Sequence, residues 1–220
     1  MDERERGSEG SGDGESEPVV VYSDYVCPFC YLGRESLKRY QERREEPLAV
    51  DWRPFDLRSG KRNPDGSIDH SVEDGKDEDY YRQARENVRR LQEEYDVEME
   101  FDLATEVDSL PAQVVSYYLR EHHDYGTWLA FDEAVFATLW EGGRDIGDTD
   151  LLVELATDAG AEPEEVRSAL SDETLLEEVR ERFDEARRHG VTGVPTFVYE
   201  DHGARGAVPP EQLRRLVEGN

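Results

Sequence analysis

The stretch Ser23-Asp24-Tyr25-Val26-Cys27-Pro28-Phe29-Cys30-Tyr31-Leu32-Gly33 decides the fold, because it places two cysteines between an apolar run and a helical pattern. The run before it, Val19-Val20-Val21-Tyr22, is apolar and β-branched, which predicts a buried strand. Pro28 suits the first turn of a helix, where its missing N–H is not needed. Apolar residues then recur at helical spacing to about Arg44. The cysteine pair is therefore predicted to lie where a strand gives way to a helix.

Outward from this junction, the sequence alternates between strand and helix patterns. Residues 48–55 (Leu-Ala-Val-Asp-Trp-Arg-Pro-Phe) predict a second strand that ends near Pro54. A polar loop over 57–76 precedes a series of helical patterns, whose apolar positions fall within 81–95, 114–119, 128–139, 151–156, 166–170 and 175–186. Residues 195–199 then predict a strand, 201–203 a turn, 204–208 a returning strand and 210–217 a closing helix.

This order predicts an α/β chain with a thioredoxin-like fold and an inserted all-helical domain. The opening is β-α-β, many helices follow, and the end is β-β-α. We expect the thioredoxin-like domain to comprise residues 18–56 and 174–220, and the helical insertion to comprise 57–173. Residues 1–17 are rich in Gly, Ser, Glu and Asp, which predicts a disordered acidic tail.

The composition excludes several classes of function. The chain has 54 acidic and 26 basic residues, so its formal net charge of −28 repels nucleic acid phosphates and anionic membranes. Its only lysines are Lys38, Lys61 and Lys76, and acidic excess with so little lysine is typical of proteins from extreme halophiles. No apolar run approaches the roughly 20 residues of a transmembrane helix. The N-terminus lacks the apolar centre of a signal peptide, so we expect a cytoplasmic protein.

Cys27 and Cys30 have the spacing of a redox pair. The N-terminal end of a helix offers free N–H groups and a positive dipole end, which favour the thiolate form of Cys27 as the attacking species. Cys30 lies one turn further in, where it can attack a mixed disulfide and release the substrate. A metal site competes weakly, because it needs about four ligands and the chain has no second cysteine pair. A passive disulfide across so short a loop stabilises little. We therefore predict no metal and no cofactor.

A second signal lies far along the chain, in Gly190-Val191-Thr192-Gly193-Val194-Pro195-Thr196-Phe197. A proline that enters a strand is unusual unless the geometry is special. An ordinary trans turn proline is the simpler interpretation of Pro195 taken alone. Paired with the cysteines, a cis Val194-Pro195 bond is favoured, because it places backbone beside the redox pair. Val194 is then expected to hydrogen-bond an extended substrate segment by strand addition.

Four motifs in this order resemble the DsbA family of thiol–disulfide oxidoreductases, and in particular its FrnE-like branch. They are the cysteine stretch at 23–33, Trp-Arg-Pro-Phe at 52–55, Glu-Gly-Gly-Arg-Asp-Ile-Gly-Asp at 141–148, and the segment 190–197. The resemblance spans about residues 19–217. It implies a thioredoxin domain with a helical insertion and disulfide exchange with protein thiols. It also implies Cys27 as nucleophile, Cys30 as resolving thiol and Pro195 as the cis-proline.

One stretch departs from these relatives. They often carry Asn-Thr…Ala-His at the start of the insertion helix, where this chain has Asp-Ser at 108–109 and Ala-Gln at 112–113. No role in substrate choice is therefore carried over to that helix.

Three further residues are candidates for the site. Asp24 either shuttles a proton or caps a turn, and the cap is favoured because Asp is common at such positions. Phe29 and Tyr31 either form an apolar rim that binds substrate or pack against the inserted domain.

Three functions fit these residues. The first is dithiol–disulfide exchange on protein substrates, as oxidant, reductant or isomerase, with glutathione as a further partner. The second is a glutathione-dependent isomerase or transferase of the related kappa-class type, whose members typically have serine at the first cysteine position. The third is a non-enzymatic chaperone or binding module. Two thiols favour the first, because exchange needs both. Neither the direction of electron flow nor the oligomeric state follows from the sequence.

Overall fold

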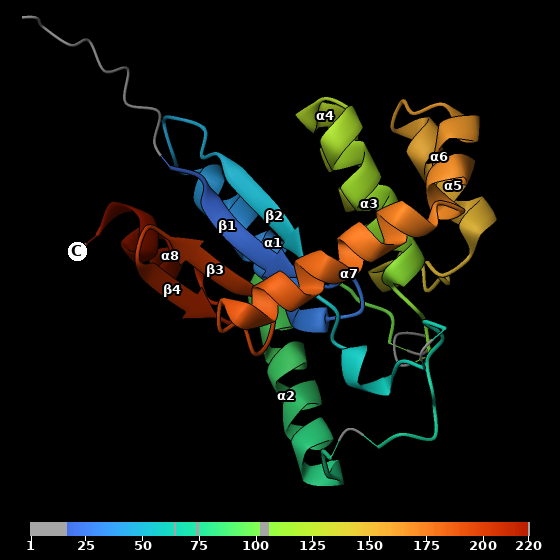
Figure 1. The fold of residues 1–220 in the computed structure, drawn as a ribbon. Helices are drawn as coiled ribbons and strands as arrows, with labels where there is room; N and C mark the ends of the chain where they lie inside the picture. Colours follow the sequence, from blue (N-terminus) through green and yellow to red (C-terminus); the bar gives the residue numbers. More distant parts are fainter. Residues whose placement is uncertain (1–16, 64, 74, 102–105, 220) are drawn as a thin grey trace, which may run out of the picture.

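The chain folds around a four-stranded mixed sheet with the strand order β2-β1-β3-β4 (Figure 1). The computed structural model describes residues 17–63, 65–73, 75–101 and 106–219. The strands are β1 (Val19–Ser23), β2 (Val50–Pro54), β3 (Thr196–Tyr199) and β4 (His202–Arg205). β1 pairs with β2 in parallel, whereas β3 is antiparallel to both β1 and β4. The first and last segments of the chain therefore build one sheet.

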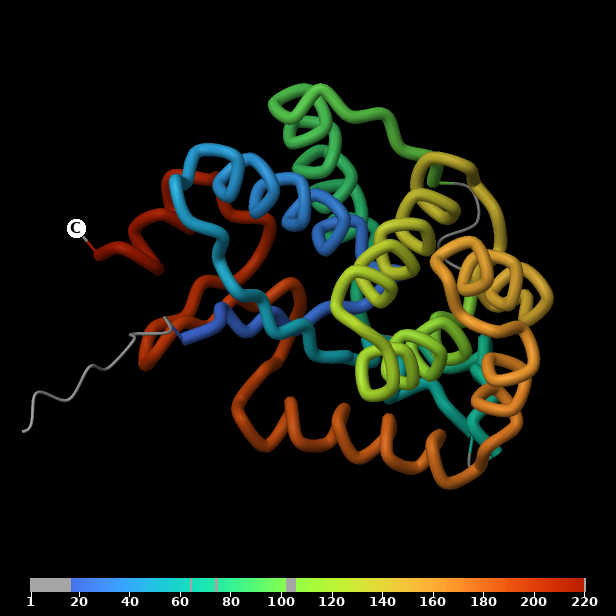
Figure 2. Tube along the Cα trace, turned by 90° about the horizontal axis from the view of Figure 1, so that it is seen from above, coloured from blue at the N-terminus to red at the C-terminus, as the bar shows by residue number. Residues whose placement is uncertain are grey.

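Helices cover both faces of this sheet (Figure 2). Helices α1 (Pro28–Gln41) and α8 (Pro210–Glu218) lie on one face, and α7 (Glu173–Arg188) lies on the other. Successive side chains of a strand point to opposite faces. Accordingly, Val19 and Val21 of β1 pack with Leu37 of α1, while Tyr22 packs with Ala186 of α7. Because β1 is covered on both sides, its run of apolar residues is continuous rather than alternating.

The remaining helices lie between β2 and α7 in the sequence. A short helix η1 (Ser59–Lys61) is followed by α2 (Glu78–Tyr95), α3 (Leu110–His122), α4 (Tyr125–Trp140), α5 (Thr149–Asp158) and α6 (Pro163–Leu170). This is the predicted fold class, a thioredoxin-like sheet interrupted by helices. None of the helices in the described ranges is both long enough and apolar enough to cross a membrane.

The largest apolar cluster joins these helices to the cysteine segment. Phe131 and Trp140 of α4 and Leu152 of α5 are buried in the same cluster as Cys27 and Cys30. The helical segment therefore forms part of the surroundings of the cysteines. The predicted division at residues 57 and 174 stays a prediction, and the predicted tail lies outside the described residues except for Glu17.

The position of the final hairpin was predicted wrongly. The expected turn over 201–203 is instead a two-residue turn at Glu200-Asp201, because Tyr199 pairs directly with His202. Glu200 takes the left-handed conformation, with φ of 51°. Packing explains the register, since Ala204 is 7% exposed and lies opposite Phe197, which is fully buried. Gly203 therefore lies inside β4, and this strand ends at Arg205 rather than at Val208.

Candidate active site

Cys27 lies at the N-cap of α1, at the predicted junction of strand and helix. Its N–H donates to the Asp24 carbonyl at 3.1 Å, which closes the turn that leads from β1 into the helix. Its Sγ lies 3.4 Å from the carbonyl oxygen of Val194, to which the thiol donates. The helix N-terminus carries partial positive charge, which favours an anionic sulfur at this place. Cys27 therefore has the position of an attacking thiol.

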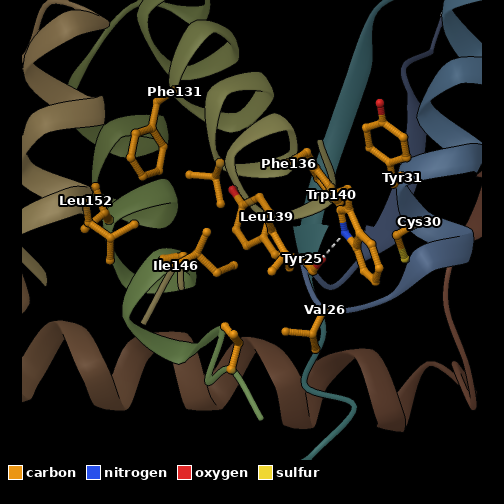
Figure 3. Packing of buried hydrophobic residues seen from close by; sticks show 14 of the residues in the cluster. Tyr25, Val26, Cys30, Tyr31, Phe131, Phe136, Leu139, Trp140, Ile146 and Leu152 are labelled. Atoms are coloured by element: carbon orange, nitrogen blue, oxygen red, sulfur yellow. Dashed lines mark hydrogen bonds between the residues drawn. The ribbon is translucent and has the colours of Figure 1, made fainter. Parts of the chain in front are cut away.

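Cys30 lies behind Cys27, one turn into α1, and its N–H donates to the Cys27 carbonyl at 2.9 Å. Both cysteines are free thiols, and Cys30 is only 1% exposed. Figure 3 shows Cys30 beside Trp140, whose indole N–H donates to the Tyr25 carbonyl at 2.8 Å. Burial, together with the neighbouring Cys27, raises the pKa of the Cys30 thiol well above its ordinary value. Cys30 therefore stays protonated until a reaction step removes its proton.

The Val194-Pro195 bond is cis, as the sequence predicts. The surrounding segment is held from both sides: Thr196 donates its hydroxyl to the Gly193 carbonyl at 2.7 Å, and the Gly206 N–H donates to the Pro195 carbonyl at 2.8 Å. The segment thus brings the Val194 backbone beside Cys27, across 167 positions of sequence. The predicted contact of Val194 and Pro195 with substrate stays a prediction.

Gly33 allows α1 to approach the cis-proline segment closely. A Cβ atom at this position would lie 3.0 Å from Cγ of Pro195 and 3.3 Å from Cζ of Phe197. Both neighbours are held firmly, since Phe197 is fully buried and the Pro195 carbonyl is hydrogen-bonded. Glycine within a helix is otherwise unfavourable, so this close approach explains its presence.

Replacement of Gly33 by alanine is expected to destabilise the protein by about 1–2 kcal/mol, because overpacking outweighs the gain of about 1 kcal/mol in helix propensity. Gly60→Ala is the control, since a Cβ there meets nothing within 4 Å. Urea unfolding of both variants measures the effect. A Gly33→Ala protein more stable than the parent would contradict this account of the packing.

Asp24 connects three segments around the cysteines. Its carboxylate accepts from the Val26 N–H at 3.3 Å, from the Leu57 N–H at 2.9 Å and from the Ser109 hydroxyl at 2.6 Å. The bond to Val26 is the turn cap that the sequence favoured, and the other two link this turn to the end of β2 and to the start of α3. A role of Asp24 in proton transfer stays a prediction.

The stability of the protein should depend on pH through Asp24. Burial raises the pKa of Asp24 from 3.8 to about 6, against the hydrogen bonds from Ser109 and Leu57, which lower it. A raised pKa means that the folded state holds this proton more tightly than the unfolded state. The wild type should therefore lose about 3 kcal/mol relative to Asp24→Asn as pH rises from about 4 to about 7.

Urea unfolding of both proteins across this range measures the difference. Asp65→Asn is a suitable contrast, because hydrogen bonds from Ser67 lower the pKa of Asp65 and its contribution has the opposite sign. A stability difference between wild type and Asp24→Asn that stays constant with pH would show that Asp24 does not titrate in this way.

The start of α3, where the sequence departs from the family that it resembles, contributes side chains that hydrogen-bond to the segments around the cysteines. Ser109 occupies the N-cap position, but its hydroxyl donates to Asp24, and Asp108 accepts from the Leu110 N–H at 2.9 Å instead. Gln113 is buried and donates to the Phe55 carbonyl at 2.8 Å. These residues therefore fix the end of β2 against the cysteine segment.

Phe29 and Tyr31 flank Cys30 on α1 but differ in their surroundings. Tyr31 is buried, and its hydroxyl donates to Glu141 at the end of α4 at 2.9 Å. Phe29 is half-buried against the same apolar cluster as the cysteines. Tyr31 therefore packs against the helical segment, and Phe29 keeps an exposed part beside Cys27. Substrate binding by either residue stays a prediction.

Sequence reasoning missed a buried ion pair beside the site. Arg34 of α1 pairs with Asp132 of α4, and both side chains are at most 10% exposed. Tyr25 donates to the same carboxylate at 2.6 Å. The Arg34 guanidinium lies between the rings of Trp52 and Phe136, 4.8 and 4.9 Å from their centres. The only sequence signal was an arginine on the buried side of α1.

No group of three or more His, Cys, Asp or Glu side chains in the described ranges is arranged to hold a metal ion.

Comparisons with known proteins identify the family and the fold. The model of a family described as the DSBA-like thioredoxin domain matches residues 18–218. The uncharacterised Bacillus subtilis protein YwbO is 26% identical over 200 residues, which are 90% of this chain and 94% of that protein.

Two solved structures share the fold. One is a probable DsbA oxidoreductase from Streptomyces coelicolor, with a TM-score of 0.73, 25% identity, and coverage of 92% of this chain and 90% of that one. The other is a 2-hydroxychromene-2-carboxylate isomerase, with a TM-score of 0.70, 20% identity, and coverage of 91% and 92%. At 20% identity, the likeness to the isomerase concerns the fold.

Proposed function

Because the chain belongs to the family of DSBA-like thioredoxin domains, we propose that it exchanges a Cys27–Cys30 disulfide or dithiol with protein thiols. The observation that carries this proposal is the place of Cys27, at a helix N-terminus with its sulfur beside the Val194 carbonyl. Cys30 lies directly behind it, buried and free. One sulfur meets the substrate and the other resolves the intermediate.

In the reducing direction, the Cys27 thiolate attacks one sulfur of a substrate disulfide. A bond forms between Cys27 and the substrate, the substrate S–S bond breaks, and the leaving thiolate takes a proton from solvent. Cys30 then loses its proton and attacks Cys27. This step forms the Cys27–Cys30 bond and releases the second substrate thiolate. Oxidation of a substrate dithiol follows the same steps in reverse.

The surroundings of Cys27 suit an extended protein segment. Half-buried apolar residues pack against the apolar cluster that contains both cysteines, and they include Phe29 and Val194. The Val194 backbone offers a place where a substrate strand can pair, by the mode known from strand addition. A substrate held there presents its sulfur to Cys27.

The experiment that tests this function follows the reduction of a protein disulfide, such as insulin, by the reduced protein under single-turnover conditions. We expect one disulfide to be reduced for each Cys27–Cys30 disulfide formed. A parallel assay presents glutathione and an isomerisable chromene substrate. Isomerase activity without any protein disulfide exchange would instead favour the alternative that the sequence left open, the kappa-class type.

The remaining expectations about the setting of the protein stay predictions. They are a cytoplasmic location, a halophilic source and the presence of protein and glutathione thiols as partners. The charge of −28 and the scarcity of lysine support the second of these.

A further inference from the structure

The resolving step poses a problem of proton transfer. Cys30 must lose its proton to attack Cys27, yet its thiol is 1% exposed and its pKa is raised by burial. In the mixed disulfide, the sulfur of Cys27 is bonded to substrate and cannot take this proton. The Asp24 carboxylate, which lies just before the cysteines in the chain, already accepts hydrogen bonds from Val26, Leu57 and Ser109. Another group must therefore connect Cys30 to solvent.

Ser23 is placed to do this. As the last residue of β1, it points to the same face as Val19 and Val21, which is the face covered by α1. Its hydroxyl is buried and makes no hydrogen bond of ordinary geometry within the described part of the chain. It nevertheless lies close enough to Cys30 to oppose the rise in the pKa of that thiol, as does the backbone of Asp24. An unpaired buried hydroxyl is unfavourable for stability, which suggests a role beyond packing.

A small cavity, whose largely apolar lining also carries polar groups, begins at the same residue. It has a volume of about 40 Å³ and is bounded by Ser23 and residues of β2, α3 and α4. Its polar lining includes Gln113, Ser116 and Asp132. A space of this size with several polar partners has room for a water molecule. Ser23 therefore lies on the wall of a cavity that can hold water, on the sheet face that α1 and its buried thiol cover.

We propose that Ser23 is a proton-relay residue, through which the thiol of Cys30 exchanges its proton with this cavity. The inference rests on the proposed exchange function. As Cys30 attacks Cys27, its S–H proton passes to Oγ of Ser23, and the hydroxyl proton of Ser23 passes to water in the cavity. The Cys27–Cys30 bond forms, the bond from Cys27 to substrate breaks, and the departing thiolate is protonated from solvent. Electrons and protons balance without a further reactant.

Several charged or titratable groups face this path and enter its pH dependence. The cysteine segment, α1, β2, α3 and α4 all contribute such groups. They are Asp24, Tyr25, Cys27, Arg34, Arg53, Tyr117, Arg120 and Asp132. Asp132 is paired with Arg34, and Arg53 and Arg120 share the Asp51 carboxylate, so each charge of the cavity wall has a partner of opposite sign. The path itself is neutral, which suits the passage of a proton rather than its storage.

The test measures the reaction of Cys27 and the reaction of Cys30 as two successive kinetic phases. Dithiobis(nitrobenzoate) releases one coloured thiolate when Cys27 attacks it, and a second when Cys30 resolves the mixed disulfide. In Ser23→Ala, we expect the first phase to be unchanged and the second to slow by about tenfold to a hundredfold, with its pH profile moved to higher pH. Ser23→Thr keeps a hydroxyl and should retain the rate. Ser36→Ala is the matched control, because the Ser36 hydroxyl is also buried but donates to the Val208 carbonyl at 2.5 Å.

The outcomes distinguish this inference from the function on which it rests. A second phase in Ser23→Ala that stays within about twofold of the parent at every pH would overturn the relay. The exchange function itself is judged on the parent protein. It is supported if the parent shows both the attack by Cys27 and the resolution by Cys30, and it is refuted if the parent shows neither. Ser23→Val, compared with Ser23→Thr, repeats the test at equal side-chain volume should the alanine variant fold poorly. Of these two variants, only Ser23→Val is expected to show the slower second phase.

Discussion

A Cys27→Ser variant is expected to lose protein disulfide exchange by about 1,000-fold or more, because the remaining thiol cannot take over the attack. Cys30 is 1% exposed, and burial raises the pKa of its thiol well above the ordinary value. It therefore offers no thiolate for the attack. The rate of insulin reduction in the presence of excess dithiol, compared with the parent, measures the loss.

Cys30→Ser provides the matched control for this loss. It keeps the attacking sulfur beside the Val194 carbonyl and removes only the resolving thiol. The first attack should proceed at the parental rate, while turnover stops at the mixed disulfide. Equal retention of turnover in both variants would place the exchange activity elsewhere in the chain.

The second large effect concerns stability rather than chemistry. Asp132→Ala is expected to lower the free energy of unfolding by about 3 kcal/mol, because it removes the buried partner of Arg34 and leaves this cation only the exposed Glu133 carboxylate, 3.8 Å away. The side chains of Arg34 and Asp132 are 10% and 7% exposed, so water does not replace the lost carboxylate. Tyr25 loses its hydrogen-bond acceptor at the same time. Urea unfolding, followed by tryptophan fluorescence, measures the change.

The control for Asp132→Ala is an exposed ion pair that also joins segments far apart in the sequence. Arg43, in the turn that follows α1, and Glu211 of α8 lie 2.7 Å apart, with side chains 59% and 58% exposed. Such pairs contribute little, so Glu211→Ala should change stability by about 0.5 kcal/mol or less. Equal losses of stability in the two variants would show that burial of the Arg34–Asp132 pair does not increase its effect on the free energy of unfolding.

Local patterns were enough to predict the framework of the site. The apolar run at 19–22, the proline after Cys27 and the helical spacing that follows each depend on neighbours within a few residues. They predicted that the cysteines lie where β1 gives way to α1, and the structure confirms this position. The cis Val194-Pro195 bond was also predicted, because the proline at a strand entry and the cysteine pair support the same arrangement.

The groups that surround the cysteines could not be predicted in this way. Asp24 and Ser109 are separated by 85 positions, and Arg34 and Asp132 by 98, so no local spacing relates them. In the sequence, Ser23 is an ordinary serine at the end of a predicted strand. Only the register of the sheet shows that its side chain points toward the face covered by α1. The hairpin turn was misplaced for a related reason: the pairing of Phe197 with Ala204 sets its register, whereas the glycine at 203 suggested a turn.

The central claim, that Cys27 is the thiol that meets protein substrates, is tested most directly by trapping. The reduced Cys30→Ser variant is mixed with a protein that contains one disulfide, and the products are identified by mass spectrometry under non-reducing conditions. We predict a covalent adduct in which Cys27 is joined to a substrate cysteine, because no resolving thiol remains to release it. An absence of any adduct, while the parent reduces the same substrate, would contradict the account.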